Sequence, residues 1–212
     1  MPSSEEFDQA LDTIAEYVHA IGDEISEENV GSLTVEVRGE EYELTGHTCV
    51  GEEDSVYMIA GHPDLEFFYV VYALSVTGNV ANQLDESIVD GLLEGQEDLD
   101  DTVRKRRAAK MLLERLPRGD MDALKAYTFM FLSSGHNNTL LHSDENGVFE
   151  YYTVENQIFP YEDDFSIREV QDAVQSTVTG GRRGNHLLRR TLFIDKDEDD
   201  PSESEINLNF GW

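Results

Sequence analysis

The sequence predicts an α+β domain built on an antiparallel sheet with flanking helices. Segments with strand patterns, alternating or continuously apolar, come in two groups, and segments with helical spacing stand before, between and after them. The 212 residues are 39% hydrophobic, which is enough to bury one sizeable core. We expect one domain over residues 1–194, with 1–100 and 101–194 as possible sub-halves, followed by a disordered acidic tail over 195–212 with an apolar end.

The first predicted element is a helix over residues 5–21. Ser3 and Glu6 have the spacing of a capping box, and Gly22 is a typical helix stop. Apolar residues between them recur at helical spacing: Phe7, Leu11, Ile14, Val18 and Ile21.

Four strands are predicted next. The segment 32–39 alternates apolar and polar residues and pairs with 41–50 across a turn at Gly39-Glu40. A third strand covers 55–62. The segment 66–76 is apolar on both faces and is therefore expected to be a central, covered strand.

The second half repeats the order of helix and strands. Residues 82–100 predict a short helix and an acidic linker, and 102–116 predict a helix that ends at Pro117. A helical turn over 121–126 then leads to a strand over 127–134. Residues 138–154 predict a hairpin with a type I′ turn at Asn146-Gly147.

The last predicted helix covers residues 165–178. It opens with a second capping-box spacing, Ser166 and Glu169, and Gly180-Gly181 is expected to end it. The segment 185–194 fits a helix and a strand equally.

The charge of the chain is large and uneven. Residues 1–100 carry 25 acidic residues and one basic residue, 101–190 carry 13 of each, and 191–212 carry seven acidic and one basic, which gives a net charge of −30. Acidic residues occur throughout the patterned segments and only four residues are lysine, which is typical of a halophile protein that works in concentrated salt. High salt would screen the self-repulsion of such a surface.

Two basic clusters stand out against this acidity. Their members are Arg104, Lys105, Arg106, Arg107, Lys110, Arg115 and Arg118 in the first, and Arg182, Arg183, Arg189 and Arg190 in the second. One interpretation is a site for nucleic acid or another anionic ligand, because arginine binds phosphate and carboxylate in a bidentate manner. The other is that these residues neutralise the acidic half of the chain, within the chain or across a dimer. High salt favours the second, since phosphate binding weakens steeply with salt.

No motif predicts catalysis or a cofactor. Cys49 lies two residues from His47, but a buried structural cysteine is the expected role, and Ser133, Ser134 and His136 lack a nucleophile elbow. His136 and His142 lack the further ligands that a metal needs. One cysteine, no signal peptide and no long apolar run predict a cytoplasmic protein without a membrane partner.

The apolar end of the tail suggests a docking peptide. Leu208, Phe210 and Trp212 follow an acidic spacer, and such a segment could dock on this chain or on a neighbour; a frayed tail is the alternative.

The order of elements over residues 5–180 resembles the type III secretion chaperone-like fold. The resemblance rests on the helix at 5–21, the strands between 32 and 76, the helix at 102–116, the strands between 127 and 154 and the helix at 165–178. It implies a non-enzymatic binding module, often a homodimer, that cradles a partner polypeptide segment. We therefore expect a chaperone-like adaptor with a protein partner, and a groove between the apolar strands and the 102–116 helix. The alternatives are a nucleic-acid or anionic-ligand binder and, third, a hydrolase of unknown type.

Overall fold

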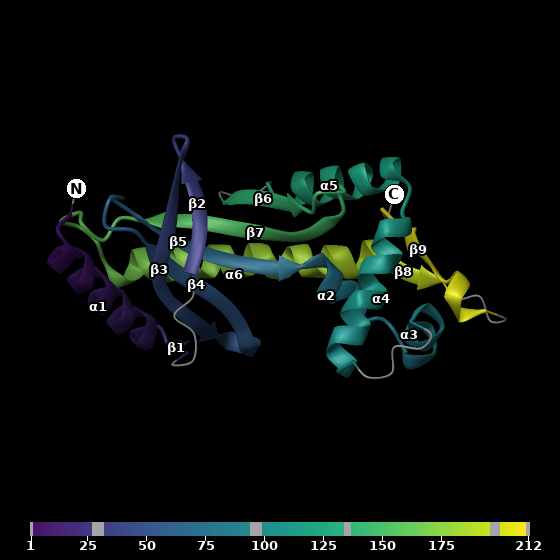
Figure 1. Cartoon of the computed structure of the whole chain (residues 1–212). Helices are drawn as coiled ribbons and strands as arrows, with labels where there is room; N and C mark the ends of the chain where they lie inside the picture. The colour runs from purple at the N-terminus through teal and green to yellow at the C-terminus, as the bar shows by residue number, and fades with distance from the viewer. Residues whose placement is uncertain (1, 27–31, 94–98, 134–136, 196–199, 211–212) are drawn as a thin grey trace. The chain divides into compact units, whose positions relative to one another are not determined.

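A computed structural model describes residues 2–26, 32–93, 99–133, 137–195 and 200–210 (Figure 1). The chain forms two compact units. Unit 1 comprises Met1–Tyr72, His136–Asn138 and Val154–Gly180, and unit 2 comprises Ala73–Gly135, Thr139–Thr153 and Gly181–Trp212. This division differs from the expected sub-halves, because single strands and one long helix continue from one unit into the other.

Unit 1 holds the first strand group except for residues 73–75 at the end of its last strand. These strands are β1 (Glu24–Ile25), β2 (Ser32–Val37), β3 (Glu40–Gly51), β4 (Ser55–Gly61) and β5 (Phe68–Ser75). The pairs β2–β3, β3–β4 and β4–β5 are antiparallel, and β3 also pairs with β1. The sheet order is β1-β3-β4-β5-β7-β6, with β2 paired to β3 off this path. The α+β prediction, a mostly antiparallel sheet with flanking helices, is confirmed.

The β2–β3 turn lies one residue earlier than predicted. Its central residues are Arg38 and Gly39, with φ of 56° and 84°. Two positive φ values are the requirement of a type I′ turn, which a glycine in the second position accommodates without strain.

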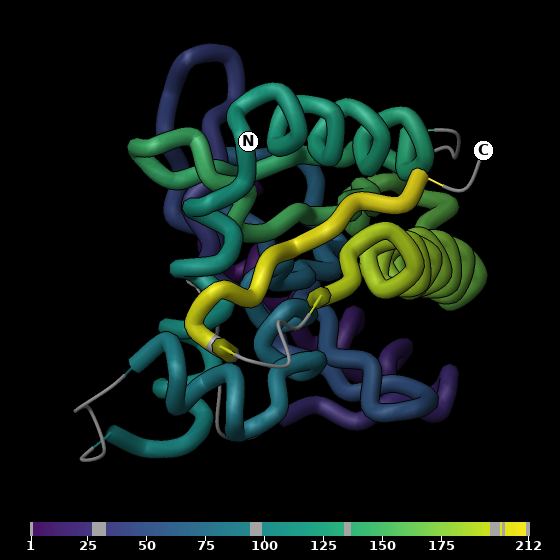
Figure 2. Tube along the Cα trace, turned by 90° about the vertical axis from the view of Figure 1, so that its right-hand side faces the viewer, coloured from purple at the N-terminus to yellow at the C-terminus, as the bar shows by residue number. Residues whose placement is uncertain are grey.

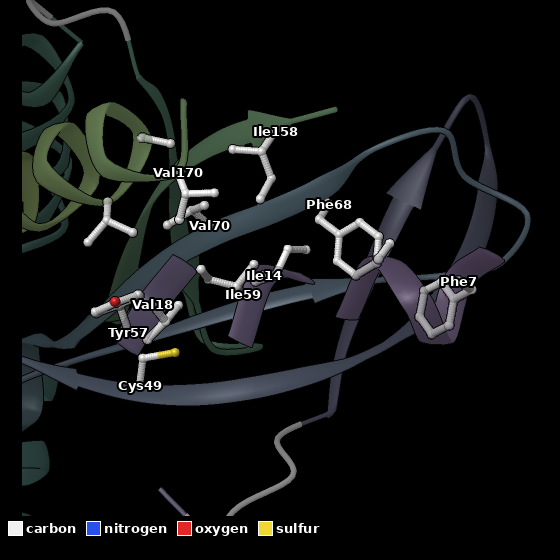
Figure 3. Close-up of a cluster of buried hydrophobic side chains, with 13 residues drawn as sticks. Phe7, Ile14, Val18, Cys49, Tyr57, Ile59, Phe68, Val70, Ile158 and Val170 are labelled. Atoms are coloured by element: carbon white, nitrogen blue, oxygen red, sulfur yellow. The ribbon is translucent and has the colours of Figure 1, made fainter. Parts of the chain in front are cut away.

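Helix α1 (Ser4–Ala20) covers the core of unit 1, and its predicted capping box is present. The Ser3 hydroxyl oxygen accepts from the Glu6 amide at 3.2 Å, and the Glu6 carboxylate accepts from the Ser3 amide at 2.7 Å. Figure 3 shows α1 side chains among those of the strands and of the last helix, α6 (Ile167–Thr191). The cluster joins these fully or nearly fully buried residues: Phe7, Ile14, Val18, Cys49, Tyr57, Ile59, Phe68, Val70, Ile158 and Val170.

Unit 2 begins with helices. They are α2 (Val76–Ala81), α3 (Glu86–Leu92), α4 (Asp101–Arg115) and α5 (Arg118–Leu132). The predicted strand over 127–134 is wrong, because α5 continues to Leu132. Its buried residues Met121, Leu124, Thr128 and Leu132 keep helical spacing, so packing of one helix face outweighs the strand preference of the aromatic and β-branched residues.

The second hairpin is formed by β6 (Asn138–Ser143) and β7 (Phe149–Ile158). Its turn is not type I′, since only Gly147 in the connection has a positive φ, 82°. Asp144 organises the loop instead. Its carboxylate accepts from the amides of Asn146 and Val148, each at 2.9 Å.

The last helix, α6 (Ile167–Thr191), is 25 residues long. Gly180 and Gly181 do not end it, and the undecided segment 185–194 is helix up to Thr191 and then strand β8 (Leu192–Asp195). A residue larger than glycine does not fit at Gly184 in this helix, because the Tyr152 side chain occupies the space in which a Cβ would lie.

The C-terminal residues are folded where the structure describes them. Strand β9 (Glu205–Leu208) pairs antiparallel with β8, and Ile206 is buried. Figure 2 shows this yellow segment running back toward α5. The expectation of a disordered tail over 195–212 therefore does not hold for β9 or for Asp195 at the end of β8, while residues 196–199, 211 and 212 lie outside the described part. Among the described helices, none is long and apolar enough to span a bilayer.

Candidate functional site

Unit 1 contains a groove of about 990 Å³. Four pieces of the unit form it: the start of α1, the β2–β3 turn with the strand residues beside it, the β4–β5 connection, and the end of β7 with the segment after it. Its lining residues are Pro2, Glu6, Val37, Arg38, Glu40, Tyr42, Asp64, Leu65, Glu66, Phe67, Gln157, Phe159, Tyr161 and Glu162.

Aromatic side chains form the wall of the groove. Phe67 and Phe159 meet edge to face with ring centroids 6.3 Å apart. The ring centroids of Tyr161 and the buried Phe68 are 6.2 Å apart, so the wall packs against the core. Phe159 is 36% exposed, so a large apolar surface stays accessible within the groove. Such a wall binds apolar or cationic groups through its faces and excludes water from them.

The rim of the groove is acidic. Five of the lining residues are carboxylates, and Arg38 is the only cation among them. Glu40 accepts the Tyr42 hydroxyl at 2.8 Å, and this hydrogen bond raises the pKa of Tyr42. The amide and hydroxyl of Ser3 lower the pKa of Glu6, which therefore stays charged at neutral pH.

One polar atom in the wall is buried without a partner. The Tyr161 hydroxyl makes no hydrogen bond among the described residues. Burial, and then the nearby charge of Glu6, raise the pKa of Tyr161 to about 12, so the hydroxyl remains a donor. An aromatic wall, an acidic rim and a spare donor make a binding groove.

Residue spacing does not predict this groove. The sequence predicts one between the apolar strands and the 102–116 helix, whereas the groove found here has no lining residue from α4. A signal was present in two short segments where aromatic and acidic residues are neighbours: Asp64–Phe67 and Phe159–Glu162. Their convergence depends on the path of the chain, which spacing alone does not give.

Most predicted cations on α4 are engaged inside unit 2. Arg104 binds Asp90 at 2.6 Å, and Lys110 lies 3.2 Å from Asp144 and 3.4 Å from Glu150. The pKa of Lys110 is raised mainly by its hydrogen bond with Asp144. Arg106 and Arg107 are exposed and have no ion pair among the described residues.

Two further contacts bind the first cluster locally. Lys105 pairs with Asp101 one helical turn earlier, at 3.8 Å. Arg115 donates to the backbone oxygen of Ser202 at 2.8 Å, near the C-terminus. Three of the seven cations of the first cluster are thus paired with carboxylates of unit 2.

The second cluster lies on the C-terminal half of α6. Arg183, Arg189 and Arg190 are exposed and have no ion pair among the described residues, and Arg182 is half-buried. The two clusters look equivalent in the sequence. In the structure they differ, because carboxylate partners are present for three cations of the first cluster and for none of the exposed arginines of the second among the described residues.

The predicted docking residues of the tail lie against unit 2. Leu208 is opposite Leu192 in the β8–β9 ladder. The rings of Phe210 and Tyr127 are 5.1 Å apart, and the Tyr127 hydroxyl donates to the Phe210 backbone oxygen at 3.0 Å. Trp212 lies outside the described residues.

The other reactive residues are in structural positions. Cys49 is fully buried, and burial raises its pKa to about 12, which keeps the thiol protonated and unreactive. The imidazole of His47 lies 3.3 Å from the Leu11 carbonyl of α1. His142 stacks on Tyr151 at 4.2 Å, and His136 lies outside the described residues. The described residues contain no group of three or more metal-binding side chains.

Comparison with known proteins gives information on the fold alone. No protein-family model matches the sequence, and no curated protein matches it. The structure is similar to that of an uncharacterized protein from Methanothermobacter thermautotrophicus, with a TM-score of 0.51 and 11% sequence identity. The match covers 85% of this chain and 97% of that one. It supports the α+β architecture as a whole and says nothing of activity.

Proposed function

We propose that the protein is a non-enzymatic, chaperone-like adaptor that holds a segment of a partner polypeptide in the unit 1 groove. The observation that carries the proposal is the aromatic wall of the groove, formed by Tyr42, Phe67, Phe159 and Tyr161. Exposed aromatic side chains in a concave site are typical anchors for polypeptide binding.

The charges of the groove define the segment. Five carboxylates against one arginine favour a segment that carries lysine or arginine beside apolar residues. Salt at molar concentration screens the charge attraction but leaves apolar burial in place. The aromatic wall therefore supplies the affinity at high salt, and the rim selects against acidic segments where the salt is low enough to leave its charges unscreened.

The test is a selection of random displayed peptides on the whole immobilised protein in about 0.1 M KCl, where the Debye length is about 10 Å and the rim charges still act. Enrichment of sequences with aromatic or aliphatic residues beside basic ones is expected. The enriched peptide should bind the Phe159→Ser variant at least about tenfold more weakly. Phe193→Ser on β8 is the matched control, because Phe193 is 43% exposed and lies in unit 2. Enrichment of acidic peptides, or equal binding by the two variants, would contradict the proposal.

The setting that we propose is the cytoplasm of a halophile. The net charge of −30 and the single buried cysteine support it. The proposal includes a homodimer, as the chaperone-like resemblance implies. Sedimentation equilibrium in about 2 M KCl should then give twice the 24.0 kDa chain mass, and a monomer at micromolar concentration would refute that part.

A further inference from the structure

Most of α6 and the first three residues of β8 form a stretch without acidic residues. From Ala173 to Ile194 there is no aspartate or glutamate, although the chain holds 45 of them. The same stretch contains four arginines and one histidine. In so acidic a protein, this local reversal of charge calls for a cause.

Helical geometry gathers these side chains. His186 lies four residues from Arg182 and Arg190, and three residues from Arg183 and Arg189, so all five share one face of α6. The opposite face is buried, with Gly181, Gly184, Leu187 and Leu188. We call the set Arg182, Arg183, His186, Arg189 and Arg190 the α6 basic face.

The α6 basic face differs from half of the cations of α4 in its partners. On α4, Arg104, Lys105 and Lys110 have carboxylate partners in unit 2, whereas Arg106 and Arg107 have none among the described residues. On α6, Arg183, Arg189 and Arg190 have none among the described residues, and none of their neighbours one turn away is acidic. Favourable interaction with the helix dipole explains arginines only in the last turn of a helix. It does not explain Arg183, which lies two turns earlier.

Exposed rings accompany the guanidinium groups. His186 is exposed at the centre of the face, and Phe193, three residues after Arg190, is 43% exposed on β8. Guanidinium groups bind phosphates in a bidentate manner, and flat rings stack on unpaired bases. An acidic polypeptide would use the arginines but has no need of the rings.

We propose that the α6 basic face, with Phe193, binds single-stranded nucleic acid. The arginines contact successive phosphates over the roughly 10 Å between Arg183 and Arg190, and His186 and Phe193 stack on bases. The net charge of −30 opposes long-range attraction of a polyanion, so binding depends on these short-range contacts. This site lies in unit 2 and is independent of the polypeptide groove.

The experiment measures fluorescence anisotropy of a labelled single-stranded oligouridine with the whole protein, from about 0.3 M to about 2 M KCl. The triple variant Arg183→Ala/Arg189→Ala/Arg190→Ala should weaken binding at least about tenfold and reduce the salt slope by about 2. The matched control is Arg106→Ala/Arg107→Ala/Arg118→Ala, which removes the same charge from exposed arginines elsewhere and should change affinity less than about twofold. Circular dichroism confirms that both triple variants are folded.

A second variant separates stacking from charge. Phe193→Ala should weaken binding about threefold to tenfold and leave the salt slope unchanged. Equal loss in the two triple variants, or equal affinity for polyglutamate or for duplex RNA, would overturn the proposal. Phe159→Ser should leave oligouridine binding intact, so failure of this site is distinguishable from failure of the groove.

Discussion

Tyr152 on β7 donates its hydroxyl to the backbone oxygen of Gly181 on α6 at 2.8 Å. One turn further along the helix, Gly184 lies directly against that hydroxyl and against Leu132. Both Tyr152 and Gly184 belong to unit 2 and are buried. The absence of a side chain at position 184 is what lets the tyrosine reach the helix backbone, so the glycine serves packing inside the helix and does not mark its end.

Gly184→Ala should destabilise the protein. A Cβ at this position collides with the Tyr152 hydroxyl and crowds Leu132, and such overpacking costs about 1–3 kcal/mol, which exceeds the gain of about 1 kcal/mol in helix propensity. Urea unfolding in about 2 M KCl measures the difference.

Gly119→Ala is the control for this substitution. Gly119 is also helical, on α5, but a Cβ there meets nothing within 4 Å. This variant should be as stable as the wild type or more stable by up to about 1 kcal/mol. If both alanines stabilise the protein equally, the packing role of Gly184 is refuted.

The sequence predicted the elements that local patterns determine. The helix over 5–21 has a capping box and regular apolar spacing, and it forms as α1. The errors fall where tertiary packing decides. Residues 127–134 have strand-like composition, but 127–132 bury a helical face, and Gly180-Gly181 lie inside α6, where residues of β7 contact them. No local signal reports what packs against a glycine.

The candidate sites show the same limit. The basic clusters were visible in the sequence, but only the ion pairs Arg104–Asp90 and Lys110–Asp144 show which cations are already engaged. The aromatic groove combines residues more than 100 positions apart, such as Tyr42 and Phe159. Such convergence follows from the path of the whole chain and has no periodic signature.

Alkaline pH should destabilise unit 1 through Cys49. Burial raises the pKa of the folded thiol to about 12, against an ordinary value of 9.0. Between these values the unfolded chain releases a proton that the native state keeps, so the free energy of unfolding falls as pH rises, by up to about 1.4 kcal/mol per pH unit from this group. Below pH about 8 the contribution is fully present and constant.

Cys49→Ala isolates this effect. Urea unfolding between pH 8 and 11 should give a shallower pH slope for the variant than for the wild type, even though the variant loses packing at every pH. Parallel slopes would contradict the assignment. A thiol reagent at pH 8 should also react slowly with the native protein and fast once urea unfolds it.

The C-terminal segment should stabilise unit 2. Phe210→Ala removes the edge-to-face contact with Tyr127, and such aromatic pairs are worth about 0.5–1.5 kcal/mol beyond their buried area. Urea unfolding should therefore show a loss of about 1–3 kcal/mol. Phe193→Ala is the control, because Phe193 is 43% exposed and should change stability by less than about 0.5 kcal/mol. A Phe210→Ala variant as stable as this control would show that the tail does not hold unit 2 together.

Salt should stabilise the protein, and a row of carboxylates on α1 allows a sharp test. Asp8, Asp12 and Glu16 are exposed at successive spacings of four residues, where like charges repel.

Asp12→Lys converts this row into two attractive pairs. It should therefore raise the melting temperature in about 0.1 M KCl, where the Debye length is about 10 Å, and have little effect in about 2 M KCl. The wild-type melting temperature should itself rise steeply between these conditions, because the net charge of −30 is then screened. Asp12→Asn, which removes the repulsion without adding attraction, should lie between the two proteins at low salt. If the wild type melted at the same temperature at both salt concentrations, self-repulsion would not limit its stability, and the acidic surface would need another explanation.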